Sequence, residues 1–125
     1  MQNESGFDLS VFLNSSGRQL NQYMARIVAT GGVSREHVLQ FILPNMETMD
    51  DEHIVYSIYA VLYIDPQLLV MRVDQFLESP DKYVRLAALN AVFGMPRISK
   101  STKRKSLDII EKEYPKCEHL LPPTE

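Results

Sequence analysis

Side chains that could perform catalysis are few and scattered in this chain of 125 residues. The histidines, His37, His53 and His119, lie outside any His-Glu-x-x-His pattern, and the single cysteine, Cys117, has no Cys-x-x-Cys partner. A metal site needs several ligands that converge at suitable spacing. A nucleophilic site needs a serine or cysteine beside a histidine and an acid, and the Gly-x-Ser-x-Gly elbow is absent. We therefore expect a protein that is not an enzyme, without a resident metal or cofactor.

A row of tyrosines is the most distinctive set of side chains that could bind a partner. A helix expected at 50–64 carries them on one face, because residues three and four positions apart share a side of a helix: Tyr56, Tyr59 and Tyr63. Tyrosine is enriched in interface hot spots and supplies a large contact area. The alternative is that a second row of helices covers these rings. Four acids at the edge of this face are suited to steering a basic partner: Glu47, Asp50, Asp51 and Glu52.

A basic cluster near the C-terminus offers a second candidate site. Five positive charges lie within nine positions: Arg97, Lys100, Lys103, Arg104 and Lys105. They stand at the N-terminal end of an expected helix, where the helix dipole disfavours positive charge. Intrahelical ion pairs, such as Arg104 with Asp108, are one compensation. Binding of nucleic acid or of an acidic partner is the other.

Composition places the chain among ordinary globular proteins, with 45% hydrophobic and 23% charged residues. The net charge of −3 weighs against a dedicated nucleic-acid binder. A single cysteine is typical of a reducing compartment. The first ten residues lack the features of a signal peptide, and no apolar run approaches the ~18 residues of a membrane span. We expect a cytoplasmic protein that has one domain over 1–125, makes no membrane contact, and is a monomer or a weak dimer.

Helical periodicity covers nearly the whole chain, whereas strand signals are almost absent. The expected helices lie at 8–14, 18–30, 34–43, 50–64, 66–77, 81–93 and 102–114. Gly31-Gly32 is a helix C-terminal signal, Ser101 is expected to cap the last helix, and a loop is expected at 45–49. Residues 115–125 are expected to form a loose tail. About seven helices with short connections predict an all-α fold of antiparallel hairpins.

The helix expected at 81–93 is apolar on two opposite faces. One face is small and consists of Val84, Ala88 and Ala91. The other face is large and consists of Leu86, Leu89 and Phe93. A helix with two apolar faces must be covered on both, which is typical of an interior helix in a stack.

The sequence around this helix resembles a HEAT repeat over residues 68–93. The turn and the second helix match the family at Pro80, Asp81, Val84, Arg85, Ala88 and Ala91. Ser79 stands where the family usually has an aspartate that braces the arginine. A degenerate second unit is expected at 38–64. The resemblance implies a short right-handed superhelical stack, and such stacks serve mainly as binding surfaces.

Size, acidity and the edge of tyrosines and acids together predict a non-catalytic protein-binding domain. The most specific form of this prediction is a bacterial immunity or antitoxin-type protein that binds and blocks a basic toxin, such as a nuclease. A general adaptor or scaffold protein is one alternative. A nucleic-acid-binding helical repeat that uses the segment 97–105 is the other.

Overall fold

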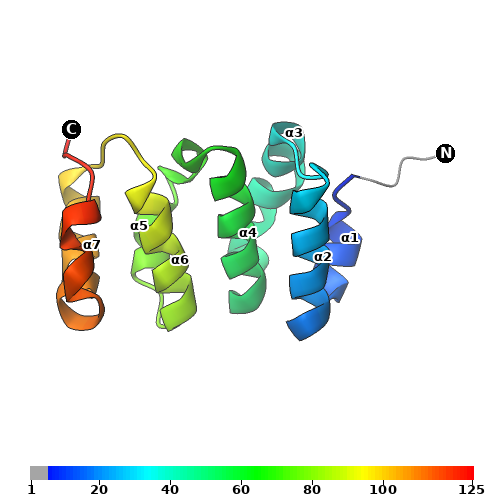
Figure 1. The fold of residues 1–125 in the computed structure, drawn as a ribbon, viewed down its shortest axis with the longest axis horizontal. Helices are drawn as coiled ribbons and strands as arrows, with labels where there is room; N and C mark the ends of the chain where they lie inside the picture. Colours follow the sequence, from blue (N-terminus) through cyan, green and yellow to red (C-terminus); the bar gives the residue numbers. More distant parts are fainter. Residues whose placement is uncertain (1–5) are drawn as a thin grey trace. The chain divides into compact units, whose positions relative to one another are not determined.

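The structure is a computed structural model, and it describes residues 6–125. Over these residues the chain is all-α and contains no β-strand, apart from an isolated bridge between Ile98 and Thr124 (Figure 1). The predicted fold class is therefore confirmed at this level. No helix in the described part of the chain combines the length and the apolar character that crossing a membrane requires. The contacts within the chain group into two compact units, residues 1–64 and 65–125, and each is described by itself.

The first unit consists of helices with short connections. They are α1 (Leu9–Asn14), α2 (Gly17–Ala29), α3 (Arg35–His37), the π-helical η1 (Val38–Ile42), the 3-10 helix η2 (Leu43–Thr48) and α4 (Asp51–Ile64). From α3 to η2 the chain stays helical and only its pitch changes. The expected loop is therefore wrong for residues 45–48. Pro44 occupies the first turn of η2, where its missing N–H is tolerated.

Local signals set the ends of α1 and α2. Asp8 caps α1, because its carboxylate accepts hydrogen bonds from the backbone of Ser10 and Val11. At the end of α2, Gly31 has a φ of 73°, a conformation that glycine adopts without steric cost. The N–H groups of Gly31 and Gly32 then donate to carbonyl oxygens of the last turn. This is the double hydrogen bond of a Schellman motif, so the predicted stop of the second helix is confirmed.

Helices α2 and α4 lie side by side and run in the same direction (Figure 1). Two hydrogen bonds join them at the end where both begin. The backbone N–H of Gly17 donates to Glu52 over 2.9 Å, and the Tyr56 hydroxyl donates to Asn21 over 3.2 Å. The core of this unit is apolar, and its fully buried side chains include Phe12, Leu20, Ile42, Met46, Ile58 and Val61.

The second unit contains η3 (Pro66–Leu69), α5 (Val73–Leu77), α6 (Lys82–Phe93), α7 (Lys100–Glu113) and η4 (Pro115–Leu120). The single helix expected at 66–77 is wrong, since a turn at 70–72 separates η3 from α5. The backbone N–H groups of Val70 and Arg72 each bond the carbonyl three residues earlier. That is the tighter 3-10 pattern, which rarely continues for more than a turn or so.

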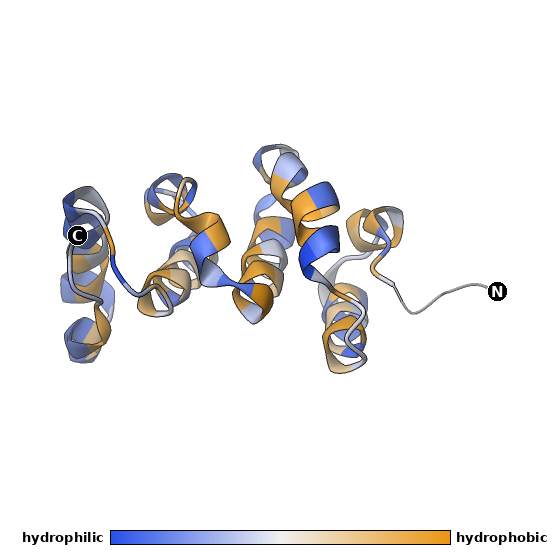
Figure 2. Ribbon diagram, turned by 90° about the horizontal axis from the view of Figure 1, so that it is seen from above, coloured by the Kyte–Doolittle hydropathy of each residue, from blue (hydrophilic) through white to orange (hydrophobic). Residues whose placement is uncertain are grey.

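Helix α7 begins earlier than the sequence suggests. Its cap is Ser99, whose side chain accepts a hydrogen bond from the Thr102 backbone, so the prediction of a Ser101 cap is wrong. Ser101 instead donates to Asp74 on α5. Figure 2 shows that α7 is mostly hydrophilic, and its buried apolar residues, Ile109 and Ile110, are adjacent. Beyond η4, the chain exchanges backbone hydrogen bonds with Ile98.

Helix α6 has buried residues on both of its apolar faces. Its small face of Val84, Ala88 and Ala91 is almost inaccessible, and so is Leu89 on the large face. Leu86 and Phe93 on that face are half-buried. Burial on both sides agrees with the pattern expected from the sequence.

The turn before α6 is held by Arg85. Its guanidinium donates to the carbonyl oxygens of Ser79 and Pro80, both over 2.9 Å, and forms an ion pair with Glu113 over 3.3 Å. Asp81 caps the helix through the backbone of its first turn. Main-chain oxygens therefore brace the arginine at the place where a HEAT repeat usually supplies an aspartate.

Candidate binding groove between α2 and α4

The tyrosine face of α4 forms one wall of an open groove, and α2 forms the other. The groove has a volume of about 380 Å³ and is lined by Asn21, Met24, Ala25, Val28, Ala29, Tyr56, Tyr59, Ala60 and Tyr63. On both helices these positions follow each other at intervals that keep them on one side. None of the nine side chains carries a charge. The groove therefore presents mostly apolar and aromatic surface.

The tyrosines differ in exposure along the groove. Tyr59 and Tyr63 are 40% and 54% exposed. Tyr56 is half-buried, and its hydroxyl is bound to Asn21. Below them, Met24 and Ala60 are buried and form the floor. The structure thus places the three predicted tyrosines along one groove and leaves Tyr59 and Tyr63 partly exposed.

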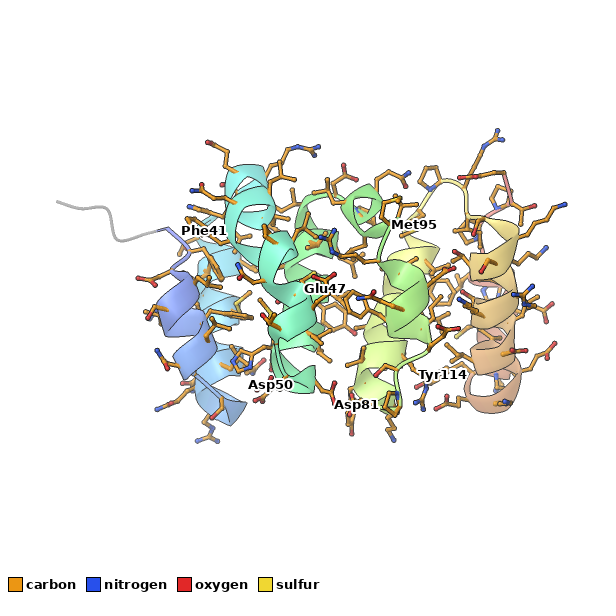
Figure 3. All side chains as sticks on the ribbon, turned by 180° about the vertical axis from the view of Figure 1, so that it is seen from behind. Phe41, Glu47, Asp50, Asp81, Met95 and Tyr114 are labelled. Carbon is orange, nitrogen blue, oxygen red and sulfur yellow. The ribbon has the colours of Figure 1, made fainter. Side chains whose placement is uncertain are left out.

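Three of the four predicted acids lie where α4 begins, beside the Tyr56 end of the groove. Two of them also support the fold: Asp50 accepts hydrogen bonds from His53, and Glu52 accepts one from Gly17. Glu47 belongs to η2 and lies apart from Asp50 (Figure 3). All four are exposed. The acidic edge predicted from the sequence therefore reduces to Asp50, Asp51 and Glu52.

His53 is a buried polar residue near this edge that sequence reasoning assigned no role. The residue is 5% exposed. Its Nδ1 lies 2.6 Å from Asp50 Oδ1, and its Nε2 lies close to the carbonyl oxygens of Phe12 and Ser15. Burial lowers the pKa of His53, but the contacts with Asp50 and with the two carbonyl oxygens together outweigh it, so the net pKa is raised. Hydrogen bonds from the backbone and the ring of His53 lower the pKa of Asp50. The Asp-x-x-His spacing at a helix start was the available signal.

The structure divides the predicted basic cluster. Lys105 forms ion pairs with Asp74 at 3.5 Å and Glu78 at 3.1 Å. Arg97 lies before α7 and is exposed. The other three basic residues, Lys100, Lys103 and Arg104, line a shallow depression. The acids Asp108 and Glu111 line the same depression. In the described part of the chain, no ion pair joins Arg104 to Asp108. The five basic side chains therefore do not form one continuous positive surface.

Metal-ligating side chains do not converge within residues 6–125, where no three of them are placed to hold an ion. His37 contributes to the capping box at the start of α3 with Ser34. Comparisons of the chain with protein-family models, with curated proteins and with solved structures found no match. The functional argument therefore depends on the site's own geometry.

Proposed function

We propose that this chain is a non-catalytic protein-binding domain that receives its partner in the groove between α2 and α4. The observation that carries the proposal is the exposure of Tyr59 and Tyr63 along a groove without charged side chains. A concave, apolar surface rimmed by polar groups is typical of interaction sites. Tyrosines in such a site provide aromatic anchors, and a few anchors carry most of the binding energy of an interface.

The preferred partner in this proposal is a basic protein. The chain has a net charge of −3, and Asp50, Asp51 and Glu52 lie at one end of the groove. Complementary charge accelerates association and selects among partners. In its most specific form, the proposal is a cytoplasmic bacterial immunity or antitoxin-type protein that occludes the active site of a basic toxin, such as a nuclease. A general adaptor or scaffold would use the same groove.

The HEAT-like stack remains part of the proposal. Its support is the resemblance of residues 68–93 and the common direction of α2 and α4, each of which follows a shorter helical segment. Nucleic-acid binding through residues 97–105 has less support. Lys105 is paired with two acids, and Asp108 and Glu111 stand among the other basic side chains.

The test uses the product of the neighbouring gene as the probe, because the immunity form of the proposal predicts that the toxin is encoded there, and affinity is measured by calorimetry. The variant Tyr59→Ala/Tyr63→Ala removes the exposed anchors, so we expect affinity to fall by about a hundredfold. The matched control is Tyr83→Ala on α6, which removes a tyrosine that is 61% exposed and outside the groove. We expect its affinity to equal that of the wild type, and circular dichroism should show unchanged helicity in both variants.

Two results would contradict the proposal at different levels. Full affinity in the double variant would show that the groove is not the binding face. No binding of the wild type to the neighbouring gene product would refute the immunity form.

A further inference from the structure

His53 lies in the first turn of α4, and each of its two ring nitrogens faces hydrogen-bond acceptors. Its Nδ1 is 2.6 Å from Asp50 Oδ1. Its Nε2 is 3.0 Å from the carbonyl oxygen of Phe12 and 2.9 Å from that of Ser15. These two carbonyl groups lie at the C-terminal end of α1, where the Phe12 carbonyl also accepts a hydrogen bond from the Ser15 backbone N–H over 3.3 Å.

This arrangement suits a doubly protonated ring. A neutral imidazole has one N–H, so in either tautomer one ring nitrogen would face acceptor oxygens with a lone pair. With both nitrogens protonated, all three contacts are hydrogen bonds. The buried ring is therefore satisfied as a cation and unsatisfied as a neutral group, which is costly away from water.

The groups that face the ring are few. Asp50, just before α4, is the titratable group in contact with it. From α1 come the two carbonyl oxygens and the Phe12 ring, whose plane is at 83° to the imidazole. Among the described residues, α2, η1 and η2 place no charged group in contact with His53.

We propose that His53 is a proton-dependent clamp that holds the end of α1 against the start of α4 and releases α1 when it loses a proton. If the remaining proton stays on Nδ1 and faces Asp50, the bonds to Phe12 and Ser15 are the ones lost. Helix α1 has only six residues, so tertiary contacts must hold it in place. We therefore expect the loss of these two contacts to change the environment of the whole helix.

The pH at which the clamp works follows from the environment of the ring. Burial lowers the pKa of His53, but Asp50 and the carbonyl oxygens of Ser15 and Phe12 together outweigh it, so the pKa in the folded protein is raised above its ordinary value of 6.5. A group with a raised pKa stabilises the fold fully below its unfolded pKa, and this stabilisation is lost as pH rises through the folded pKa. The clamp is therefore closed at pH 6 and opens at a more alkaline pH.

The experiment is a pH titration of the full chain by NMR, recording ring ¹⁵N shifts and backbone amides of α1. We expect both nitrogens of His53 to be protonated at pH 6, its midpoint to lie above 6.5, and the α1 amide shifts to follow that midpoint. In Asp50→Asn the midpoint should move down, and in His53→Gln the α1 shifts should no longer follow a titration. A ring that titrates at or below 6.5, or α1 amides that ignore its titration, would overturn the proposal. Neither result depends on a partner. Failure of this proposal would therefore leave the proposed function of the groove unaffected.

Discussion

At the residue scale, Arg85 shows how one side chain can hold a turn without an acidic neighbour in the turn. Its guanidinium binds two successive main-chain carbonyl oxygens, at Ser79 and Pro80. Guanidinium groups make several hydrogen bonds from a rigid plane, which suits two adjacent acceptors. The ion pair with Glu113 is partly exposed and adds a weaker contact. We infer that the carbonyl bonds are the larger contribution.

This ranking predicts different costs for the two partners of the ion pair. Arg85→Met keeps the apolar stem but removes the donors, so the free energy of unfolding should fall by about 1–3 kcal/mol. Glu113→Gln should cost less than about 1 kcal/mol, because it removes only the partly exposed ion pair. Urea denaturation of both variants measures the two values. Equal costs would show that the ion pair, and not the carbonyl bonds, is what holds the turn.

The candidate site could be predicted in part from individual residues. The spacing of Tyr56, Tyr59 and Tyr63 was enough to place them on one face, because helical geometry is local. The opposite wall could not be predicted, since it depends on α2 lying beside α4. The Asp-x-x-His spacing places Asp50 beside His53, but the sequence did not reveal that this histidine is buried. Two of that histidine's three partners are carbonyl oxygens from distant positions.

At the scale of elements, Asp74 joins α5 to the first turns of α7. Its carboxylate accepts hydrogen bonds from Ser101 at 2.9 Å and Thr102 at 2.5 Å, and it pairs with Lys105. Burial raises the pKa of Asp74, but these hydrogen bonds and the lysine outweigh that effect, so its net pKa is lowered. The carboxylate is therefore stabilised in its charged form by contacts that come from another helix.

We predict that Asp74→Asn lowers the free energy of unfolding at pH 7 by about 1–3 kcal/mol. The cost should shrink in acid, because a group with a lowered pKa stabilises the fold above its unfolded pKa of 3.8 and loses this effect as pH falls through the folded pKa. Glu78→Gln is the control, since that exposed acid forms its ion pair, among residues 6–125, with Lys105 alone. Urea titrations at pH 7 and pH 3 measure both. A cost that is independent of pH would exclude the charge of Asp74 as its origin.

Helix boundaries could be predicted where a single local signal sets them. They could not be predicted where tertiary contacts set them. Gly31-Gly32 ended a helix as expected, because a left-handed residue with two backbone hydrogen bonds is a local motif. Ser99 and Ser101 both have the chemistry of a cap, and the sequence does not show that Asp74 engages Ser101. The 3-10 helix η3 was missed because helical periodicity does not distinguish it from α-helix, whereas residues 45–48 of η2 were expected to form a loop.

At the scale of the molecule, the two compact units divide the candidate features between them. The groove, the acidic edge and His53 belong to residues 1–64, whereas the basic side chains and helix α6 belong to residues 65–125. The all-α class followed from periodicity over the whole chain. The partner could not be predicted, because a binding surface is defined by complementarity to a molecule that the sequence does not contain.

The most direct test of the groove is to map the contact surface by NMR while the neighbouring gene product is added to ¹⁵N-labelled protein. The account predicts that backbone shifts change chiefly at residues 21–29 on α2 and 56–63 on α4. Changes confined to α7 around Lys100, Lys103 and Arg104, with the groove unaffected, would contradict it.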